Sequence, residues 1–168
     1  MKYIKSINEF WGDVLKRDLL GETREEDKFR SKEQLQEYLK SEIEKQGENV
    51  VIKNIDVSLI EDLSRLFYNA RANSISSGIK SLDLSGWKTS NVEDMSYMFS
   101  WCTDLESLNL SGWDTSKVRS MTQMFRYCVN LKSLDLSGWD TSNVENMYAM
   151  LWNCPAPYKV IDNKIVRK

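Results

Sequence analysis

The stretch "LDLSGWKTSNVEDMSYMFSWCTDLES", residues 82–107, decides the fold, because the chain repeats it twice more without a gap. The second copy, "LNLSGWDTSKVRSMTQMFRYCVNLKS", covers 108–133, and the third, "LDLSGWDTSNVENMYAMLWNCPAPYK", covers 134–159. A weaker copy, "IKNIDVSLIEDLSRLFYNA", precedes them at 52–70. A fixed period of 26 residues indicates a repeat architecture, in which each copy stacks on its neighbours.

Each copy combines two hydrophobic patterns. Leu82 and Leu84 alternate with polar residues, which is typical of a half-buried strand. The apolar residues that follow fall at the spacing of one helical face: Val92, Met95, Met98, Phe99 and Cys102. Ser90 and Glu93 have the spacing of a capping box at the start of that helix. The sequence therefore predicts one strand and one short helix per copy.

Stacking such copies has a geometric consequence. Adjacent strands lie about 4.8 Å apart, whereas packed helices need roughly 8 to 10 Å between their axes. We therefore expect an α/β leucine-rich-repeat solenoid, with parallel strands on a concave face, short helices on a convex face and a helical cap at the N-terminal end.

The ends of the chain carry no full copy of the repeat and divide it into four segments. We expect an N-terminal helix and charged linker at 1–28, a capping helix at 29–49, leucine-rich repeats at 50–157 and a C-terminal cap strand at 158–168. The capping helix is predicted from Ser31 to Gln46, with Gly47 as its stop signal. The last segment reads as a strand or a hairpin that turns at Asp162 and Asn163.

The repeat, "LxxLDLSGWDTSNVxxMxxMFxxC", closely resembles the BspA-like leucine-rich repeat family over about 50–160. Members of that family are mostly bacterial surface proteins whose concave faces bind other proteins, so the resemblance implies binding rather than chemistry. The leader "MKYIKSINEF" is also similar to short N-terminal segments of tailed-phage proteins, which implies a phage-encoded protein.

Composition excludes several classes of function. Lys and Arg number 23 against 25 for Asp and Glu, which does not favour a nucleic-acid partner. The first 20 residues lack the continuous apolar stretch of a signal peptide or a membrane span, so we expect a cytoplasmic protein, or one in a virion or an infected bacterial cell. The absence of histidine removes the usual general bases and metal ligands. We therefore predict no enzyme, no catalytic residue, no metal and no cofactor.

Three columns of the repeat resemble reactive or ligand-binding sites. The cysteines, Cys102, Cys128 and Cys154, recur at the repeat period, so we predict a buried apolar column rather than a metal cluster. The serines of "LSGW" lack the surroundings of a nucleophile elbow. The tryptophans, Trp87, Trp113 and Trp139, are predicted to stack in the core, with ligand stacking as the alternative.

Two surfaces are candidates for binding another protein. The strand face should present its outward residues: Ser81, Asp83, Ser85, Ser107, Asn109, Ser111, Ser133, Asp135 and Ser137. The N-terminal helix should present Phe10, Trp11 and Leu15, either to a partner or to the protein's own core. The sequence thus predicts a protein-binding module; a structural or virion-packaged phage component and an intracellular inhibitor of a host enzyme are the alternatives. The partner's identity and the oligomeric state stay open.

Overall fold

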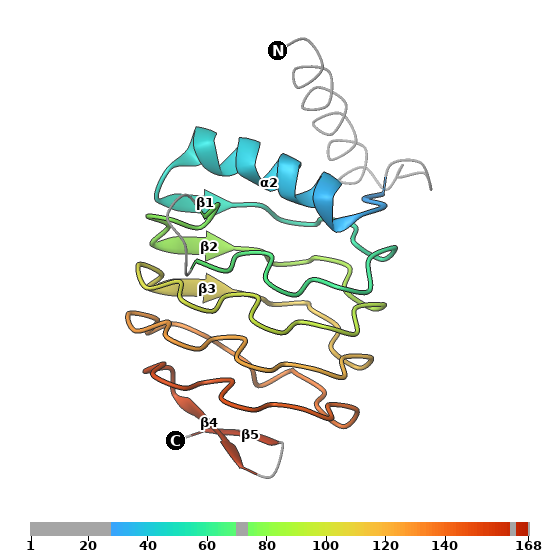
Figure 1. The fold of residues 1–168 in the computed structure, drawn as a ribbon, viewed down its shortest axis with the longest axis vertical. Coiled ribbons are helices and arrows are strands. Elements are labelled where there is room, and N and C mark those ends of the chain that lie inside the picture. Colours follow the sequence, from blue (N-terminus) through green and yellow to red (C-terminus); the bar gives the residue numbers. More distant parts are fainter. Residues whose placement is uncertain (1–27, 70–73, 162–163, 168) are drawn as a thin grey trace.

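A computed structural model describes residues 28–69, 74–161 and 164–167, and its α/β architecture has an N-terminal helix and three parallel strands. The sheet has the order β1-β2-β3, and an antiparallel hairpin closes the C-terminal end (Figure 1). The elements are α2 (Lys32–Gln46), β1 (Asn49–Val51), β2 (Ser81–Asp83), β3 (Ser107–Asn109), β4 (Tyr158–Ile161) and β5 (Lys164–Arg167).

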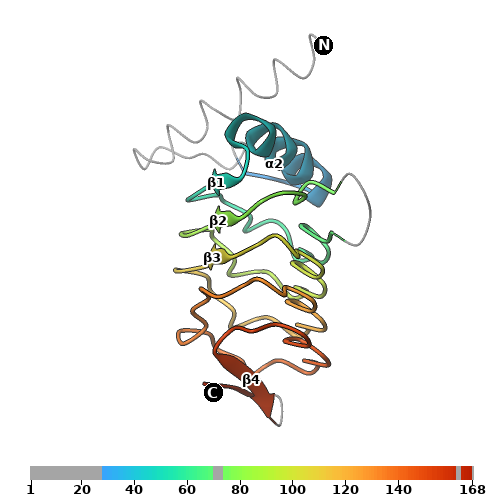
Figure 2. The same cartoon turned by 90° about the vertical axis from the view of Figure 1, so that its left-hand side faces the viewer.

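Strands β2 and β3 pair in the register that the repeat predicts, but β1 does not: Val50 lies opposite Leu82, so the first strand falls before the weaker copy at 52–70, in which Ile55 was expected at that position. Leu82 lies opposite Leu108, and a further parallel bridge joins Ser107 to Ser133, one repeat later. Figures 1 and 2 show the copies as coils stacked one below another. We call them coil 1 (49–69), coil 2 (79–104), coil 3 (105–130) and coil 4 (131–156).

The short helix predicted in each copy is wrong. From Met95 onward the chain forms successive turns, in which the Met98 N–H donates to the Met95 carbonyl at 3.3 Å and the Ser100 N–H donates to the Tyr97 carbonyl at 3.0 Å. Tyr97 and Trp101 have φ of 60° and 65°, a left-handed conformation that ends an α-helix. The predicted burial was nevertheless right, because Met95, Met98, Phe99 and Cys102 are all buried. The predicted capping box has no helix to cap.

The turns are joined from coil to coil by a second row of backbone hydrogen bonds, which we call the turn ladder. Alternate residues of one coil donate their N–H groups to carbonyls of the next coil. Between coil 3 and coil 4 the bonds measure 2.8 to 2.9 Å and join Met121 to Asn146, Gln123 to Tyr148, Phe125 to Met150 and Tyr127 to Trp152. All four N–H groups point toward coil 4, so the peptide dipoles of the turn ladder are aligned, with their carbonyl ends at coil 1.

The turn ladder also corrects the predicted curvature. Both sides of the stack are held by backbone hydrogen bonds, so neither side needs the wider spacing of packed helices. Ring centroids on the turn side are 5.3 Å apart for Phe67 and Phe99, and those on the strand side are 5.8 Å apart for Trp87 and Trp113. Because the spacings nearly match, the coils stack without a strong bend, and the strand face is not a deep concave surface (Figure 2).

The predicted capping helix is confirmed as α2. The Ser31 hydroxyl accepts the Gln34 N–H at its start, and Gly47, at φ 70°, ends it. The predicted apolar stripe is buried: Leu35, Tyr38, Leu39 and Ile43. Figure 1 shows α2 lying across coil 1, where it covers the N-terminal end of the stack.

The remaining predictions about the ends have mixed outcomes. The C-terminal hairpin is confirmed, since β4 pairs with β5, but the turn residues Asp162 and Asn163 lie outside the described residues. The predicted N-terminal helix, with Phe10, Trp11 and Leu15, also lies outside them. The four segment boundaries stay predictions. No helix in the described part is long and apolar enough to cross a bilayer.

Candidate functional site: a hollow between the last two coils

The outward-facing residues of the strands also form hydrogen bonds and an ion pair within the protein. Asp83, Asn109 and Asp135 each accept, through their side-chain oxygens, the N–H of the serine two residues later, at 2.9 to 3.1 Å. Asp83 also pairs with Lys53 at 2.9 Å. Partial burial acts to raise the pKa of Asp83, but the bonds from Lys53 and Ser85 outweigh it and hold that pKa below its usual value. These side chains therefore shape the corners of the coils.

The corner after the strand has one geometry in coils 2 and 3. Gly86 and Gly112 have φ of 73° and 84°, which side chains with a Cβ rarely adopt. In coil 2 the Leu84 N–H donates to the Asn109 carbonyl and the Gly86 N–H donates to the Ser111 carbonyl, both at 2.9 Å. The strand ladder therefore continues around the corner between these two coils.

Coil 4 departs from this geometry. Gly138, the equivalent of Gly112, does not have a left-handed φ. The N–H groups of Leu110 and Gly112, which by the pattern of coil 2 would donate to coil 4, have no partner in the described part of the chain. Pairing resumes further along, where the Thr115 hydroxyl donates to the Asp140 carbonyl at 2.9 Å. The strand ladder is thus locally open between coils 3 and 4.

The tryptophans also differ between coils 2 and 3, on the one hand, and coil 4, on the other. Trp87 and Trp113 are buried, and their indole N–H groups donate to the carbonyls of Ile52 and Leu84 at 2.7 and 2.8 Å, which confirms the predicted core stacking for these two. Trp139 is only half-buried and packs against Phe125 instead, at 6.2 Å between ring centroids. Coil 4 carries Leu151 where coils 1 to 3 carry phenylalanine, so it has no ring to continue the stack of Phe67, Phe99 and Phe125.

The open corner forms a hollow of about 730 Å³, the strand-side hollow. Trp113 and Trp139 lie on its two sides, and six of the nine predicted face residues line it: Ser107, Asn109, Ser111, Ser133, Asp135 and Ser137. The other three, Ser81, Asp83 and Ser85, belong to coil 2 and do not reach it. The sequence missed Leu110 and Gly112, whose unpaired N–H groups depend on backbone geometry alone.

The C-terminal hairpin holds the open corner in place. The Tyr158 hydroxyl donates to the Asp135 carboxylate at 3.0 Å and accepts the Leu136 N–H at 3.3 Å. An adjoining hollow of about 450 Å³ lies between this hairpin and the same corner, with Tyr158, Pro157 and Ile165 in its lining. The hairpin thus engages polar groups that a further coil would otherwise pair.

A model of one protein family matches residues 33–163, which is most of the chain. Its description is "Mycoplasma protein of unknown function, DUF285". The chain belongs to the DUF285 family. That family is leucine-rich-repeat-like, in agreement with the repeated sequence. No curated protein and no solved structure matched the DUF285 chain.

The cysteine column of this DUF285 chain is buried, as predicted. The thiols of Cys102 and Cys128 lie 3.1 and 3.0 Å from the carbonyl oxygens of Phe67 and Phe99. Burial raises the pKa of Cys102 to about 12 and that of Cys128 well above its usual value. Both thiols therefore stay protonated at neutral pH and are poor nucleophiles.

Proposed function

We propose that this DUF285 chain is a non-catalytic protein-binding module, built on a short BspA-like leucine-rich-repeat solenoid. The repeated sequence, the parallel strands and the inter-coil ladders support the solenoid. The module binds a segment of another protein at the strand-side hollow.

One observation carries this proposal: the strand-side hollow combines unpaired main-chain donors with aromatic walls. The N–H groups of Leu110 and Gly112 are suited to donate hydrogen bonds to the carbonyl oxygens of an extended peptide. The half-buried Trp139 offers apolar surface beside them, and the buried Trp113 also reaches the lining. A volume of about 730 Å³ accommodates a few residues rather than a folded domain.

The chemistry of the chain supports binding over catalysis. The sequence has no histidine, and the thiols of Cys102 and Cys128 are buried and protonated. The acidic residues near the hollow, Asp135 among them, accept hydrogen bonds from neighbouring serine N–H groups and are committed to the turns. A proton-transfer or nucleophilic role would need a group released from such structural bonds.

The experiment fills the hollow with a side chain. Ser111→Tyr and Ser137→Tyr place a ring in its lining, whereas Ser85→Tyr is the matched control in coil 2, outside the hollow. Each variant is used to capture partners from the cell that makes the protein, with quantitative mass spectrometry. We expect at least tenfold loss of one captured protein with the first two variants and full capture with the control. Equal capture by all three would contradict the proposal.

A further inference from the structure

The turn ladder ends at coil 4 with a row of unpaired donors, which we call the open edge. By the pattern of the inner coils, the N–H groups of Met147, Ala149, Leu151 and Asn153 would donate to a following coil. None of the four has an acceptor among the residues that the structure describes. In the equivalent positions of coil 3, all four N–H groups are bonded.

The open edge presents N–H donors, whereas the carbonyl groups beside them are already hydrogen-bonded. The carbonyls of Asn146, Tyr148, Met150 and Trp152 already accept from coil 3. The intervening carbonyls of Met147, Ala149 and Leu151 accept turn hydrogen bonds within coil 4. Because the peptide dipoles of the turn ladder are aligned, this edge carries their positive ends, as the N-terminus of a helix does.

Donors cover part of the carbonyl row at the opposite end of the turn ladder. In coil 1 the Lys32 ammonium lies 3.2 Å from the Ser64 carbonyl, and the Ser74 hydroxyl donates to the Tyr68 carbonyl at 2.7 Å. Helix α2 thus supplies a cation where the carbonyl ends of the dipoles emerge. At coil 4, by contrast, no acceptor among the described residues covers the N–H groups of the open edge.

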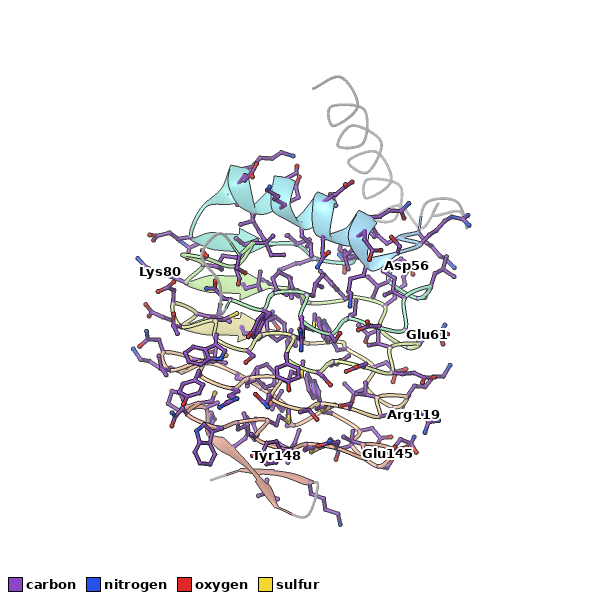
Figure 3. The ribbon with its side chains drawn as sticks, in the orientation of Figure 1. Asp56, Glu61, Lys80, Arg119, Glu145 and Tyr148 are labelled. Carbon is purple, nitrogen blue, oxygen red and sulfur yellow. The ribbon has the colours of Figure 1, made fainter. Side chains whose placement is uncertain are left out.

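Two aromatic side chains stand beside the open edge. Tyr148 and Trp152 alternate with the unpaired donors, and their exposed fractions are 73% and 59%. Figure 3 shows Tyr148 at the lower end of the stack. Exposed aromatic residues gathered in one place mark interaction surfaces more often than isolated apolar residues do.

The C-terminal segment is rich in basic residues. Segment 158–168 has four basic residues and one acidic residue, in a chain of net charge -2. Its hairpin, β4 and β5, lies beneath coil 4 at the same end of the stack (Figure 1). Of these basic side chains the structure describes that of Lys164, which is exposed, so the preference for negative charge rests on the peptide dipoles of the open edge.

A second copy of the chain does not fit the open edge. Two open edges facing each other would place donors against donors. A head-to-tail contact would need the carbonyl row of coil 1, which lies under α2, Lys32 and Ser74. Neither way of stacking two copies supplies a row of acceptors to the open edge, so the occupant must bring them.

We propose that the open edge binds an extended acidic segment of a partner protein. Its carboxylates and main-chain carbonyls accept hydrogen bonds from Met147, Ala149, Leu151 and Asn153, while Tyr148 and Trp152 pack against its side chains. This surface lies on the turn side of the stack and is separate from the strand-side hollow.

The first test uses three blocked ten-residue peptides, of glutamate, glutamine and lysine, added to the ¹⁵N-labelled full chain. We expect the glutamate peptide to shift the four amide signals of the open edge and the indole signal of Trp152, and to bind at least tenfold more tightly than the glutamine peptide. The lysine peptide should leave these signals unchanged. Affinity should fall as salt is raised, because the attraction is electrostatic. Unmoved open-edge amides, or equal affinity for glutamine, would overturn the proposal.

The second test compares one column of the repeat at two depths in the stack. Ala149→Glu adds a negative charge at the open edge, and Gln123→Glu adds the same charge one coil inward. Ala149 and Gln123 have nearly the same φ, 51° and 55°, so backbone strain is matched. We expect at least tenfold weaker glutamate-peptide binding for Ala149→Glu and less than a twofold change for Gln123→Glu. Equal losses would contradict binding at the open edge. Neither test depends on the strand-side hollow, whose role is judged by Ser111→Tyr and Ser137→Tyr.

Discussion

Coils 3 and 4 carry the same stretch, "LSGWDTS", at 110–116 and 136–142, yet they fold it differently. In coil 3 the glycine is left-handed and the indole is buried and hydrogen-bonded. In coil 4 the glycine is not left-handed and the indole packs against Phe125. Because the local sequence is identical, the neighbours set the conformation.

The neighbouring coils explain the difference. The corner of coil 3 lies between two others, so its glycine must keep the carbonyl of Ser111 aimed at the Gly86 N–H. On its outer side, the corner of coil 4 meets no further coil among the described residues; there the Tyr158 hydroxyl of the C-terminal hairpin bonds to Leu136 and Asp135. A stacked repeat is therefore uniform only where both of its faces are covered.

The largest expected effect is a difference in unfolding free energy between variants of Trp113 and Trp139. Trp113→Ala removes a buried, stacked and hydrogen-bonded indole, so we expect a loss of about 3 to 5 kcal/mol in unfolding free energy. Trp139→Ala should cost roughly half of that or less, because its indole is half-buried and the surrounding coil has no further coil beneath it. Urea denaturation of both variants measures the difference. Equal losses would mean that the coil 4 corner is as tightly packed as the coil 3 corner.

Gly112 and Gly138 form a matched pair, because they stand at the same position of an identical stretch of sequence. Gly112→Ala places a Cβ at φ 84°, which costs about 1 to 2 kcal/mol. Gly138→Ala meets no atom within 4 Å and has no left-handed φ, so its effect should stay within about 0.5 kcal/mol or be slightly stabilising. Thermal and urea unfolding decide between these outcomes. A comparable cost at both positions would show that the two corners share one conformation in solution.

The smallest expected effect concerns the carboxylate of Asp56. Burial acts to raise the pKa of Asp56, but hydrogen bonds from Ser58 and Lys88 outweigh it and hold the pKa below its usual value. This contribution to stability is present above the usual carboxyl pKa and is lost as pH falls through the lower folded pKa. Asp56→Asn keeps the acceptor for Ser58 but loses the ion pair with Lys88, so it should cost at most about 1 kcal/mol at pH 7.

The stability difference between Asp56→Asn and wild type should shrink as pH falls below the usual carboxyl pKa of about 4, and should be smallest below the lowered folded pKa, where both carry an uncharged side chain at position 56. Asp140→Asn is the comparison in coil 4, where hydrogen bonds from Ser142, rather than an ion pair, lower the pKa of Asp140. Urea midpoints measured from pH 7 to pH 3 test both. A gap between Asp56→Asn and wild type that does not change with pH would contradict the role of the carboxylate charge.

The sequence predicted the period, the register of β2 on β3 and the buried columns, because those follow from hydrophobic spacing alone. It misplaced the first strand, since the weaker copy at 52–70 has other apolar residues at strand-like spacing and Val50, not Ile55, pairs with Leu82. It misplaced the backbone after Val92, since a helix and a series of turns can bury residues at the same spacing. The distinction lies in where the Met95 N–H donates, which is to Ser120 in the next coil rather than within its own. The error in curvature followed from the error in the helix.

The strand-side hollow could be predicted only in part. Alternation identified the six face residues that line it, but identical sequences at 110–116 and 136–142 gave no sign that one corner opens. The available signals were Leu151 in the phenylalanine column and Pro155, which ends the repeat. The open edge follows from the same cause, because only a structure shows which N–H groups face a missing coil.

The two ladders also determine how the molecule would respond to a pulling force. Their hydrogen bonds run along the stack, so tension between the two ends of the chain loads one coil boundary at a time, as in a zipper. Coil 4 should detach first, since its strand ladder is already open and α2 covers the other end. Each coil that unravels would release about 90 Å of extended chain for its 26 residues. Such a molecule would lengthen in small, nearly equal steps under load instead of rupturing at once.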